Sequence, residues 1–282
     1  VLADVDRRSF NLDLADLRRR VTPRTKAVVA VHLFGLCADM DAIKAALPAH
    51  VAVVEDAACA AGASYQGRPA GGLGAVAAFS FNTRKSITTG EGGMVTTADP
   101  ELAARVEVLR NHGASVSEEV RHHGPKPYLL PDFDVMGFNY RMTDLQAAVG
   151  LVQLGKLDAF VAERAQWAGW YRERLGNLPW LRLPNEPDGG THAWQSFVAY
   201  VDPARAPCSR NRMMEILQEH GIATRPGTHA VHMLGLYRER YGVKPGDFPG
   251  ARDCAENTLA IPLHNRMTAE DYAYVADAIR GL

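Results

Sequence analysis

The sequence predicts an α/β fold, in which a mostly parallel central sheet has helices on both faces and is followed by a small C-terminal α+β domain. Helical and strand signals alternate through the first half of the chain, which is the pattern that builds a parallel sheet. The strand runs carry few charges, as expected where both faces of a sheet are covered. Shorter strands and helices follow after residue 190, which indicates a second unit.

The first half of the chain is predicted to contain three helices and four strands. The helices are expected over residues 12–21, 39–47 and 99–113, and the strands over residues 26–33, 51–55, 75–81 and 94–97. Asp99 and Pro100 are typical of a helix start, because aspartate caps the first turn and proline fits it. Residues 114–140 lack a sustained period and contain Gly124-Pro125-Lys126-Pro127, so a long functional loop is expected there.

A capping box at residues 143–146 is predicted to begin the next long helix. Four apolar residues are expected to form the buried face of this helix: Leu145, Val149, Val152 and Leu154. Another helix is expected over residues 159–178, and a loop over residues 184–190 marks a change of pattern. We therefore expect a large domain, residues 1–165, and a small domain, residues 166–282.

The small domain is predicted to combine short strands with helices. Strands are expected over residues 194–201, 222–225 and 259–262, and helices over residues 210–220, 251–258 and 268–280. Residues 225–248 are rich in glycine, histidine and tyrosine and are predicted to form a loop. This pattern is typical of an α+β unit.

Composition argues against several classes of partner. The net charge is -1 and no basic stripe is present, so nucleic-acid binding is not expected. No apolar run approaches the roughly 18 residues that cross a bilayer, so no membrane association is expected. The four cysteines are scattered without a CxxC pair, which favours a cytoplasmic protein without a zinc site. His122-His123 and the pair His229 and His232 lack further ligands at suitable spacing, so no metal is predicted.

Asp56 directly follows the strand predicted over residues 51–55, which begins with the apolar run Val51-Ala52-Val53-Val54. Its carboxylate is therefore expected at the carboxyl edge of the sheet, where open α/β folds bind ligands. Such an acid can keep the ring nitrogen of pyridoxal phosphate (PLP) protonated, as the electron-sink chemistry of that cofactor requires. Taken alone, an aspartate at this position is also typical of a helix cap or a turn.

Lys85 lies beyond a second apolar strand and before a glycine-rich run, residues 88–93. At the sheet edge beside Arg84, its amine is favoured in the neutral form that attacks an aldehyde. The alternative is an ordinary solvated lysine. Ser80 is suited either to a phosphate or to a backbone partner. The glycine-rich run lacks the spacing of nucleotide-binding loops and is also compatible with a simple turn.

Several motifs occur in a specific order along the chain. They are Glu55-Asp56-Ala57-Ala58-Cys59-Ala60-Ala61-Gly62-Ala63, Phe79-Ser80-Phe81 with Lys85, Thr88-Thr89-Gly90-Glu91-Gly92-Gly93-Met94, Leu109-Arg110-Asn111-His112-Gly113, and Gly137-Phe138-Asn139-Tyr140-Arg141-Met142 with Gln146-Ala147-Ala148. In this order the chain resembles the DegT/StrS-type sugar aminotransferases, which are PLP enzymes of fold-type I in the aspartate aminotransferase superfamily. The resemblance runs from about Asp4 to the C-terminus.

The resemblance implies a role for each residue at the cofactor. Asp56 pairs with the pyridine nitrogen, and Lys85 forms the internal aldimine and carries protons. Ser80 contacts the cofactor phosphate, and Asn139 reaches a phosphate from the partner subunit of a homodimer with shared active sites. Cys59 stands where the family usually has glutamine or another polar residue near the cofactor ring.

The same resemblance implies substrate contacts by His229, Tyr140 and Arg141. Five cations are candidates to bind the anionic part of a substrate near the entrance: Arg84, Arg121, Lys126, Arg141 and Arg225. Because the chain begins at Val1 and family members carry a preceding phosphate-binding segment, we expect that an N-terminal part is missing. A chain that truly started there is expected to be inactive.

The resemblance implies a PLP-dependent aminotransferase that moves an amino group from glutamate or glutamine to a keto sugar. The expected acceptor is a nucleotide-linked 4-keto or 3-keto deoxysugar, as in polysaccharide or antibiotic sugar biosynthesis. A cyclitol ketone such as an inosose fits the same machinery. A PLP sugar dehydratase remains open, although those relatives replace the lysine with histidine, and so do a non-catalytic family scaffold and a cofactor-free lyase that uses Lys85 alone.

Overall fold

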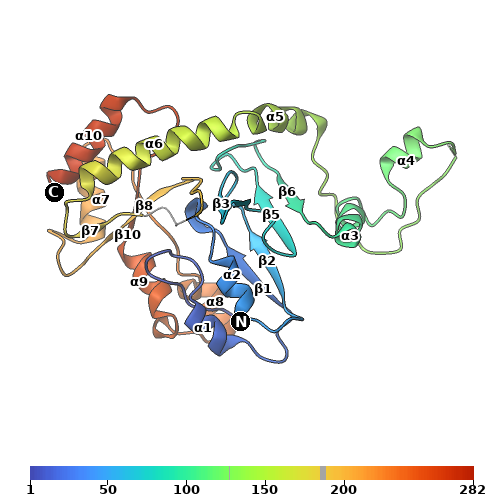
Figure 1. Cartoon of the computed structure of the whole chain (residues 1–282), viewed down its shortest axis with the longest axis horizontal. Helices are drawn as coiled ribbons and strands as arrows, with labels where there is room; N and C mark the ends of the chain where they lie inside the picture. The colour runs from blue at the N-terminus through green and yellow to red at the C-terminus, as the bar shows by residue number, and fades with distance from the viewer. Residues whose placement is uncertain (127, 185–188) are drawn as a thin grey trace.

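The computed structural model describes residues 1–126, 128–184 and 189–282, and Figure 1 shows its elements in order. The helices are α1 (Leu14–Arg20), α2 (Met40–Ala45), α3 (Pro100–Arg110), α4 (Glu118–His123), α5 (Asp144–Leu154), α6 (Leu157–Leu175), α7 (Arg210–Glu219), α8 (Gly235–Tyr241), α9 (Pro249–Asn257) and α10 (Ala269–Arg280). The strands are β1 (Ala27–Val31), β2 (Ala52–Asp56), β3 (Ser64–Tyr65), β4 (Arg68–Pro69), β5 (Val76–Ser80), β6 (Gly93–Thr96), β7 (Leu181–Arg182), β8 (Phe197–Val201), β9 (Arg225–Pro226) and β10 (Thr258–Ile261).

The larger sheet has the strand order β1-β2-β5-β6. β1, β2 and β5 are parallel, and β6 returns antiparallel to β5. The register pairs Val31 with Asp56 and Asp56 with Ala78, so the carboxyl ends of the three parallel strands lie side by side. A separate antiparallel sheet has the order β7-β8-β10-β9. These two sheets match the predicted mostly parallel sheet and the smaller α+β unit.

Helices α1 and α2 cover one face of the larger sheet. Leu17 of α1 and Met40 and Ile43 of α2 are buried with Val53 of β2 in one apolar cluster. The opposite face is only partly covered, because Val29 of β1 is 59% exposed. The low charge of the strands is therefore explained best on the face that α1 and α2 bury.

A second apolar core lies between the smaller sheet and helices α6, α7 and α10. Its largest fully buried side chains include Trp194, Phe197, Tyr171 and Tyr272. α6 serves both cores, since its Val161 joins the cluster under the large sheet and its later turns join this one. The proposed boundary between residues 165 and 166 therefore falls inside α6, and the two-domain division stays a proposal. Residues 185–188 of the predicted loop at 184–190 lie outside the described residues.

Three predictions about secondary structure are wrong in part. The predicted loop at 114–140 contains α4, and the predicted loop at 225–248 contains α8. Both helices have only six or seven residues, too few for a clear 3.6-residue period. The strand predicted over residues 222–225 is reduced to β9, of which only Arg225 and Pro226 pair with β10.

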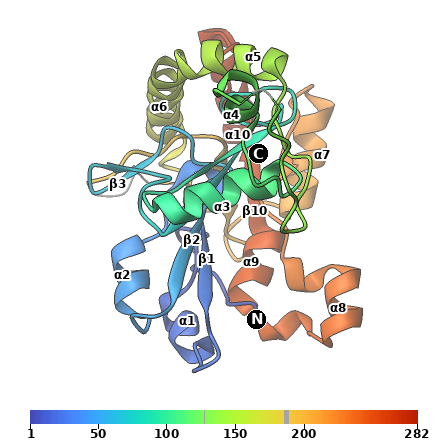
Figure 2. The same cartoon turned by 90° about the vertical axis from the view of Figure 1, so that its right-hand side faces the viewer.

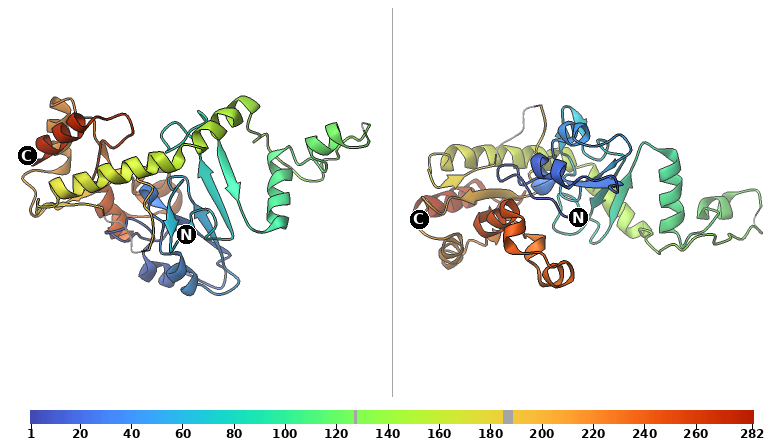
Figure 3. Two further views of the ribbon diagram at one scale, coloured as in Figure 1. Left: turned by 45° about the horizontal axis from the view of Figure 1, so that its top comes forward. Right: turned by 90° about the horizontal axis from the view of Figure 1, so that it is seen from below.

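The apolar face of α5 is exposed, which corrects the prediction that it is buried. Thr143 and Gln146 do form the predicted capping box. Exposed fractions on this face are large: Leu145 83%, Val149 50%, Val152 60% and Leu154 55%. In Figures 1 and 3, α5 lies at the outer end of the long helix α6, and α4 extends beyond α3 on an arm, residues 114–126 and 128–138. The helical period was predicted correctly, but the described part of this chain does not cover the face.

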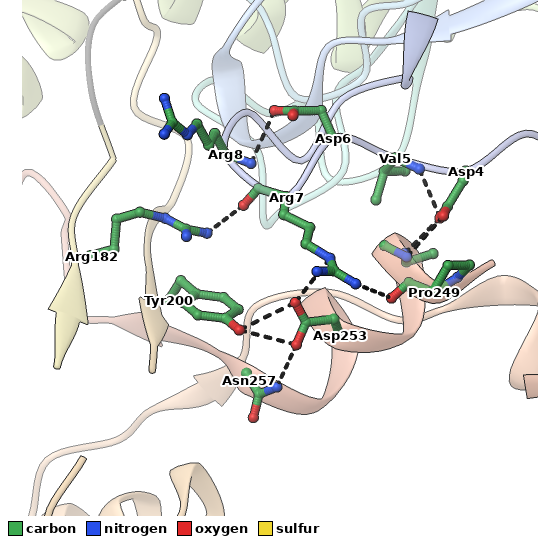
Figure 4. Close-up of polar contacts among 12 residues, drawn as sticks. Asp4, Val5, Asp6, Arg7, Arg8, Arg182, Tyr200, Pro249, Asp253 and Asn257 are labelled. Carbon is green, nitrogen blue, oxygen red and sulfur yellow. Dashed lines mark hydrogen bonds and ion pairs between the residues drawn. The ribbon is translucent and has the colours of Figure 1, made fainter. Parts of the chain in front are cut away.

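The N-terminal segment is fastened to α9, as Figure 4 shows. The Asp4 carboxylate accepts hydrogen bonds from the backbone N–H groups of Gly250 (2.8 Å) and Ala251 (2.7 Å). It therefore caps a helix almost 250 residues away, where the free N–H groups favour an anion. Arg7 adds an ion pair with Asp253 at 3.1 Å. The first residues of the chain thus anchor α9, whose buried Cys254 packs with Phe10, Phe34 and Val198 of β8.

Among the residues that the structure describes, no single helix has the length and hydropathy needed to cross a membrane. α5 and α6 pass that test only when taken together, and they are bent by 52° where they meet.

Candidate active site

The candidate site lies at the carboxyl edge of the larger sheet. His32 follows β1, Asp56 ends β2 and Ser80 ends β5. The backbone N–H of His32 donates to the carbonyl of Asp56 (3.0 Å), and the N–H of Ala57 donates to the carbonyl of Ala78 (2.9 Å). Ligands bind at such edges because the loops after parallel strands meet there.

A fully buried carboxylate, Glu55, binds the segments that meet near this edge. It accepts hydrogen bonds from His32 Nε2 (3.0 Å) and from the backbone N–H groups of Gly71 (2.8 Å), Leu73 (2.6 Å) and Gly74 (2.6 Å). His32 Nδ1 in turn accepts from the N–H of Ala38 (3.1 Å), which leaves Nε2 as the donor to Glu55. Burial raises the pKa of Glu55, but these hydrogen bonds outweigh it and hold the pKa below its ordinary value.

The sequence did not predict that His32 and Glu55 form a buried hydrogen-bonded pair that supports the site. The available signal was a carboxylate inside an otherwise apolar strand, since buried charges are rare without partners. Gly74 shows how closely the loop wraps this carboxylate, because a Cβ there would lie 2.5 Å from the carbonyl oxygen of Val53.

Asp56 is half-buried and begins the turn that carries Cys59. Its Oδ1 accepts a hydrogen bond from the backbone N–H of Ala58 (3.1 Å). The turn-forming alternative raised by the sequence is therefore realised. Only Oδ1 is used by that bond among the described residues, so the second carboxylate oxygen remains available for a ligand. A single aspartate can both shape the turn and face a cofactor.

Lys85 lies on the turn that follows β5 and reaches back to the turn after β2. Its Nζ lies 3.2 Å from Cys59 Sγ. The backbone N–H of Lys85 donates to the carbonyl of Asn82 (3.0 Å), which closes the turn. Asp56, Cys59 and Lys85, which are separated by up to 29 positions in the sequence, are thus brought to one edge.

Ser80 is half-buried at the end of β5. Its Oγ accepts a weak hydrogen bond from the N–H of Asn82 (3.3 Å). Because a hydroxyl that accepts one bond still has its proton to donate, both sequence interpretations, backbone partner and phosphate donor, are compatible with this geometry. The glycine-rich run that follows returns the chain into β6, with Phe81 N donating to the carbonyl of Gly92 at 2.9 Å.

Asn139, Tyr140 and Arg141 lie at the base of the arm that carries α4. Asn139 forms a β-bridge with Asn111, and Arg141 Nη1 donates to Asn111 Oδ1 (2.8 Å). Tyr140 is largely exposed and stacks on Phe138, with ring centroids 4.8 Å apart. These residues therefore belong to a second region, which Figure 2 shows around α3 and the arm.

Two glycines allow the arm to cross the segment that follows α3. A Cβ on Gly113 would lie only 1.8 Å from the carbonyl oxygen of Val135, and one on Gly137 would lie 2.1 Å from the N–H nitrogen of Gly113. This close approach explains why both motifs that frame the arm contain glycine.

His229 is exposed in the segment between β9 and α8. His232, three residues later, is buried, and its ring lies 4.9 Å from that of Phe248. Among the candidate cations, Arg225 Nη1 donates to the neighbouring carbonyl of Thr224 (2.7 Å). The side chain of His122 lies outside the described residues. In the described part of the chain, no group of three His, Cys, Asp or Glu residues has the arrangement of a metal site.

The donor set at the sheet edge fits PLP. An amine (Lys85), a carboxylate with an available oxygen (Asp56) and a hydroxyl with an available proton (Ser80) follow neighbouring strands. These groups complement an aldehyde, a pyridine nitrogen and a phosphate, respectively.

The chain matches an aminotransferase family and two curated relatives over nearly all of its length. A match to the DegT/DnrJ/EryC1/StrS aminotransferase family covers residues 1–280. The spore coat polysaccharide biosynthesis protein SpsC of Bacillus subtilis is 39% identical over 284 residues, which cover 100% of this chain and 73% of that protein. GDP-perosamine synthase of Caulobacter vibrioides is 38% identical over 283 residues, which cover 99% of this chain and 72% of that enzyme.

Solved structures agree with these matches. An aminotransferase from Psychrobacter cryohalolentis superposes with a TM-score of 0.92 at 29% identity, covering 100% of this chain and 74% of that one. DesV of S. venezuelae, solved with a ketimine intermediate, gives a TM-score of 0.88 at 32% identity, with 100% and 71% covered. The predicted fold class, aminotransferase activity and PLP dependence are thereby confirmed.

We predict that Glu55→Gln lowers the free energy of unfolding at pH 7 by about 3 kcal/mol, because it replaces a buried charge that four donors surround. Since folding lowers the pKa of Glu55 from 4.5, its stabilisation is complete above that pH and is lost as the pH falls through the folded pKa. Urea denaturation at pH 7 and pH 3 measures both effects. Glu173→Gln, on the exposed side of α6, is the control. Equal stability of wild type and Glu55→Gln at pH 7 would contradict the prediction.

We also predict that carboxamidomethylation of Cys59 abolishes the labelling of Lys85 by PLP and borohydride. The added group must occupy the space between two side chains that are 3.2 Å apart. Mass spectrometry of the tryptic peptides measures both modifications. A Cys59→Ser chain treated in the same way should keep its Lys85 label, which controls for alkylation of the half-buried Cys208. Equal labelling of Lys85 with and without alkylated Cys59 would disprove the contact.

Proposed function

Because this chain belongs to the DegT/DnrJ/EryC1/StrS aminotransferase family, we propose that it aminates the ketone of a nucleotide-linked keto sugar, with glutamate or glutamine as donor. The observation that carries the proposal is the convergence of Lys85 and Cys59 beside Asp56 at the sheet edge. The 38% identity to GDP-perosamine synthase supports a nucleotide sugar with a 4-keto or 3-keto group as the acceptor.

PLP supplies, when bound, an electron sink for the electron pair left by a departing proton. In the proposed mechanism Lys85 moves that proton between two carbon atoms. Its neutral amine accepts the proton from the substrate carbon and would deliver it to a carbon of the cofactor. A base must lie within hydrogen-bond reach of the proton that it takes. The contact with Cys59 and the closed turn at Asn82 hold Lys85 Nζ at the sheet edge for this task.

Asp56 is proposed to hold a proton at the pyridine nitrogen. Its orientation is set by the hydrogen bond from Ala58 and by its place at the end of β2, between two paired strands. A carboxylate fixed in this way needs little reorganisation when charge develops on the ring. Ser80 is proposed to donate its hydroxyl proton to the phosphate, since its Oγ already accepts from Asn82.

The active protein is proposed to be a homodimer in which Asn139 enters the partner's site. Asn139 is bound to Asn111 at the base of the arm. The arm and its base expose many large apolar side chains, which is typical of a surface that meets another protein. They are Tyr128, Leu130, Phe133, Met136, Phe138 and Tyr140.

The α5 face supports the same assembly. A cavity of about 210 Å³ joins Leu151 and Leu154 of α5 to Thr88 and Thr89 of the glycine-rich run. The apolar face is therefore continuous with the segment that follows Lys85, and a second copy that covered α5 would approach the active site. Tyr140, Arg141 and His229 are proposed to contact substrate in the completed site.

The reaction is proposed to take place in the cytoplasm. All four cysteines are free, two of them buried, as expected for a reducing compartment.

The substrate proposal is tested with a panel of ketones. The PLP-loaded protein is incubated with glutamate or glutamine and with 4-keto and 3-keto nucleotide sugars or cyclitol ketones, and aminated products are detected by mass spectrometry. Amination of a nucleotide-linked keto sugar is the expected result. Amination of cyclitols alone would identify the other acceptor class, and loss of a sugar hydroxyl without amination would identify a dehydratase.

We predict that Lys85→Ala and Asn139→Ala are each inactive as pure proteins but that their mixture regains activity. Removing the proton carrier should cost roughly 10²- to 10⁴-fold in rate. After random exchange, about half of the dimers are hybrids, and one of the two sites in each hybrid has both residues, so about a quarter of wild-type activity should return. The exchange is monitored by mass spectrometry and the activity by product formation. No recovery despite complete exchange would disprove a site shared between subunits.

We predict that Val149→Asp converts the dimer to a folded monomer. A carboxylate in an apolar interface should weaken the dimer by roughly 100-fold or more, whereas the side chain is half exposed within the chain and tolerates the charge. Sedimentation velocity measures the assembly and circular dichroism the fold. Glu173→Lys, on the exposed side of α6, should leave the dimer intact. A stable Val149→Asp dimer would rule out this face as the interface.

A further inference from the structure

The turn that carries Lys85 is held both by local hydrogen bonds and by hydrogen bonds from distant segments of the chain. Upstream, Asn82 Oδ1 accepts from the N–H of Arg84 (3.0 Å), and the carbonyl of Asn82 accepts from the N–H of Lys85 (3.0 Å). Downstream, Ser86 is buried, and its Oγ accepts from Arg164 Nη1 at 3.3 Å. The upstream bonds are local, but the downstream one spans 78 positions of sequence.

Arg164 joins that turn to two further segments. Its Nη1 also donates to the carbonyl of Trp194 (3.4 Å), and its Nε donates to Asn265 Oδ1 (2.9 Å). Asn265 is itself oriented, because its Nδ2 donates to Glu163 Oε2 (2.7 Å) and to the carbonyl of Phe160 (3.1 Å). Burial lowers the pKa of Arg164. A buried guanidinium needs hydrogen bonds to compensate for its lost hydration.

The segments bound by Arg164 border the second apolar core. Trp194 is fully buried in that core, and α6 supplies several of its residues. Next to Trp194, Gln195 Nε2 donates to the carbonyl of Arg84 (3.0 Å), so a second bond reaches the Lys85 turn from the same side. The residues on either side of Lys85 are therefore both bound by groups that border the second core.

We propose that Arg164 is a positioning residue for Lys85, which fixes the downstream half of the lysine turn to α6 and the second core. The proposal rests on the proposed function, in which Lys85 carries a proton between two carbon atoms. Such a carrier must be aligned with both atoms, and a misplacement of about 1 Å can cost roughly 100-fold in rate. The planar fork of arginine allows it to bind three acceptors at once, and lysine cannot reproduce that geometry.

The test compares Arg164→Lys, Ser86→Ala and the double variant, all as PLP-loaded full-length proteins. Three quantities are measured: kcat and KM for the amination, the pH midpoint of the absorbance change of bound PLP, and the rate of borohydride-trapped labelling at Lys85. Arg172→Lys, in the last turn of the same helix, is the matched control and should behave as wild type in all three.

We expect Arg164→Lys to lower kcat by roughly 100-fold with little change in KM, and to shift the pH midpoint. Ser86→Ala should share part of the loss, and the double variant should be no worse than Arg164→Lys, because both substitutions remove one interaction. A purely structural role would lower thermal stability without moving the pH midpoint. That result, or additive losses in kcat, would overturn the proposal.

Two further outcomes are informative. If Arg164→Lys fails to fold by circular dichroism, Ser86→Ala and Gln195→Leu each remove a single bond to the turn, and wild-type kcat and pH midpoint in both would overturn the proposal. Absence of any Lys85 label in the wild-type protein would instead disprove the proposed function, and the positioning role would fall with it.

Discussion

The buried carboxylate of Glu55 is the constraint on which the geometry of this site depends. It gathers His32, from the end of β1, and three N–H groups of the loop before β5 around one strand, β2. Leaving such a carboxylate unpaired would cost several kcal/mol, so these segments cannot shift independently. Asp56 is the next residue on β2, and strand alternation directs it to the opposite face. A structural acid therefore fixes the position of the aspartate that is proposed to bind the cofactor.

The same constraint extends to Lys85. β5 follows the loop that Glu55 binds, and its register with β2 pairs Ala78 with Asp56. The turn after β5 then needs only a few local bonds, through Asn82, to bring Lys85 Nζ within 3.2 Å of Cys59. Distant bonds from Gln195 to Arg84 and from Arg164 to Ser86 secure the residues on the two sides of Lys85. The lysine thus depends on both the large sheet and the second core for its position.

The sequence predicted those features that arise from local periodicity. Asp56, Ser80 and Lys85 each follow an apolar strand, and parallel strands end at a common edge, so their convergence was predictable. The tie from Arg164 to Ser86 was not, because nothing local marks a contact across 78 positions. Helices α4 and α8 were missed because one or two turns carry too little periodic signal. For α5, the periodicity predicted an apolar face. Periodicity alone does not indicate whether the same chain or another chain covers such a face.

The two regions of the candidate site are anchored to different parts of the fold, and the apolar face of α5 is exposed. Asn139, Tyr140 and Arg141 are held at the arm by Asn111 and by the close crossing at Gly113 and Gly137, while Lys85 and Asp56 are held by the sheet. Releasing the first anchor would leave the buried side chain of Asn111 without the hydrogen bond from Arg141, and releasing the second would break the hydrogen bonds between the strands. In the proposed homodimer, a second copy that covers α5 would supply its arm to the site held by the sheet. In that homodimer, association would complete the site and bury this apolar surface, which would couple assembly to catalysis.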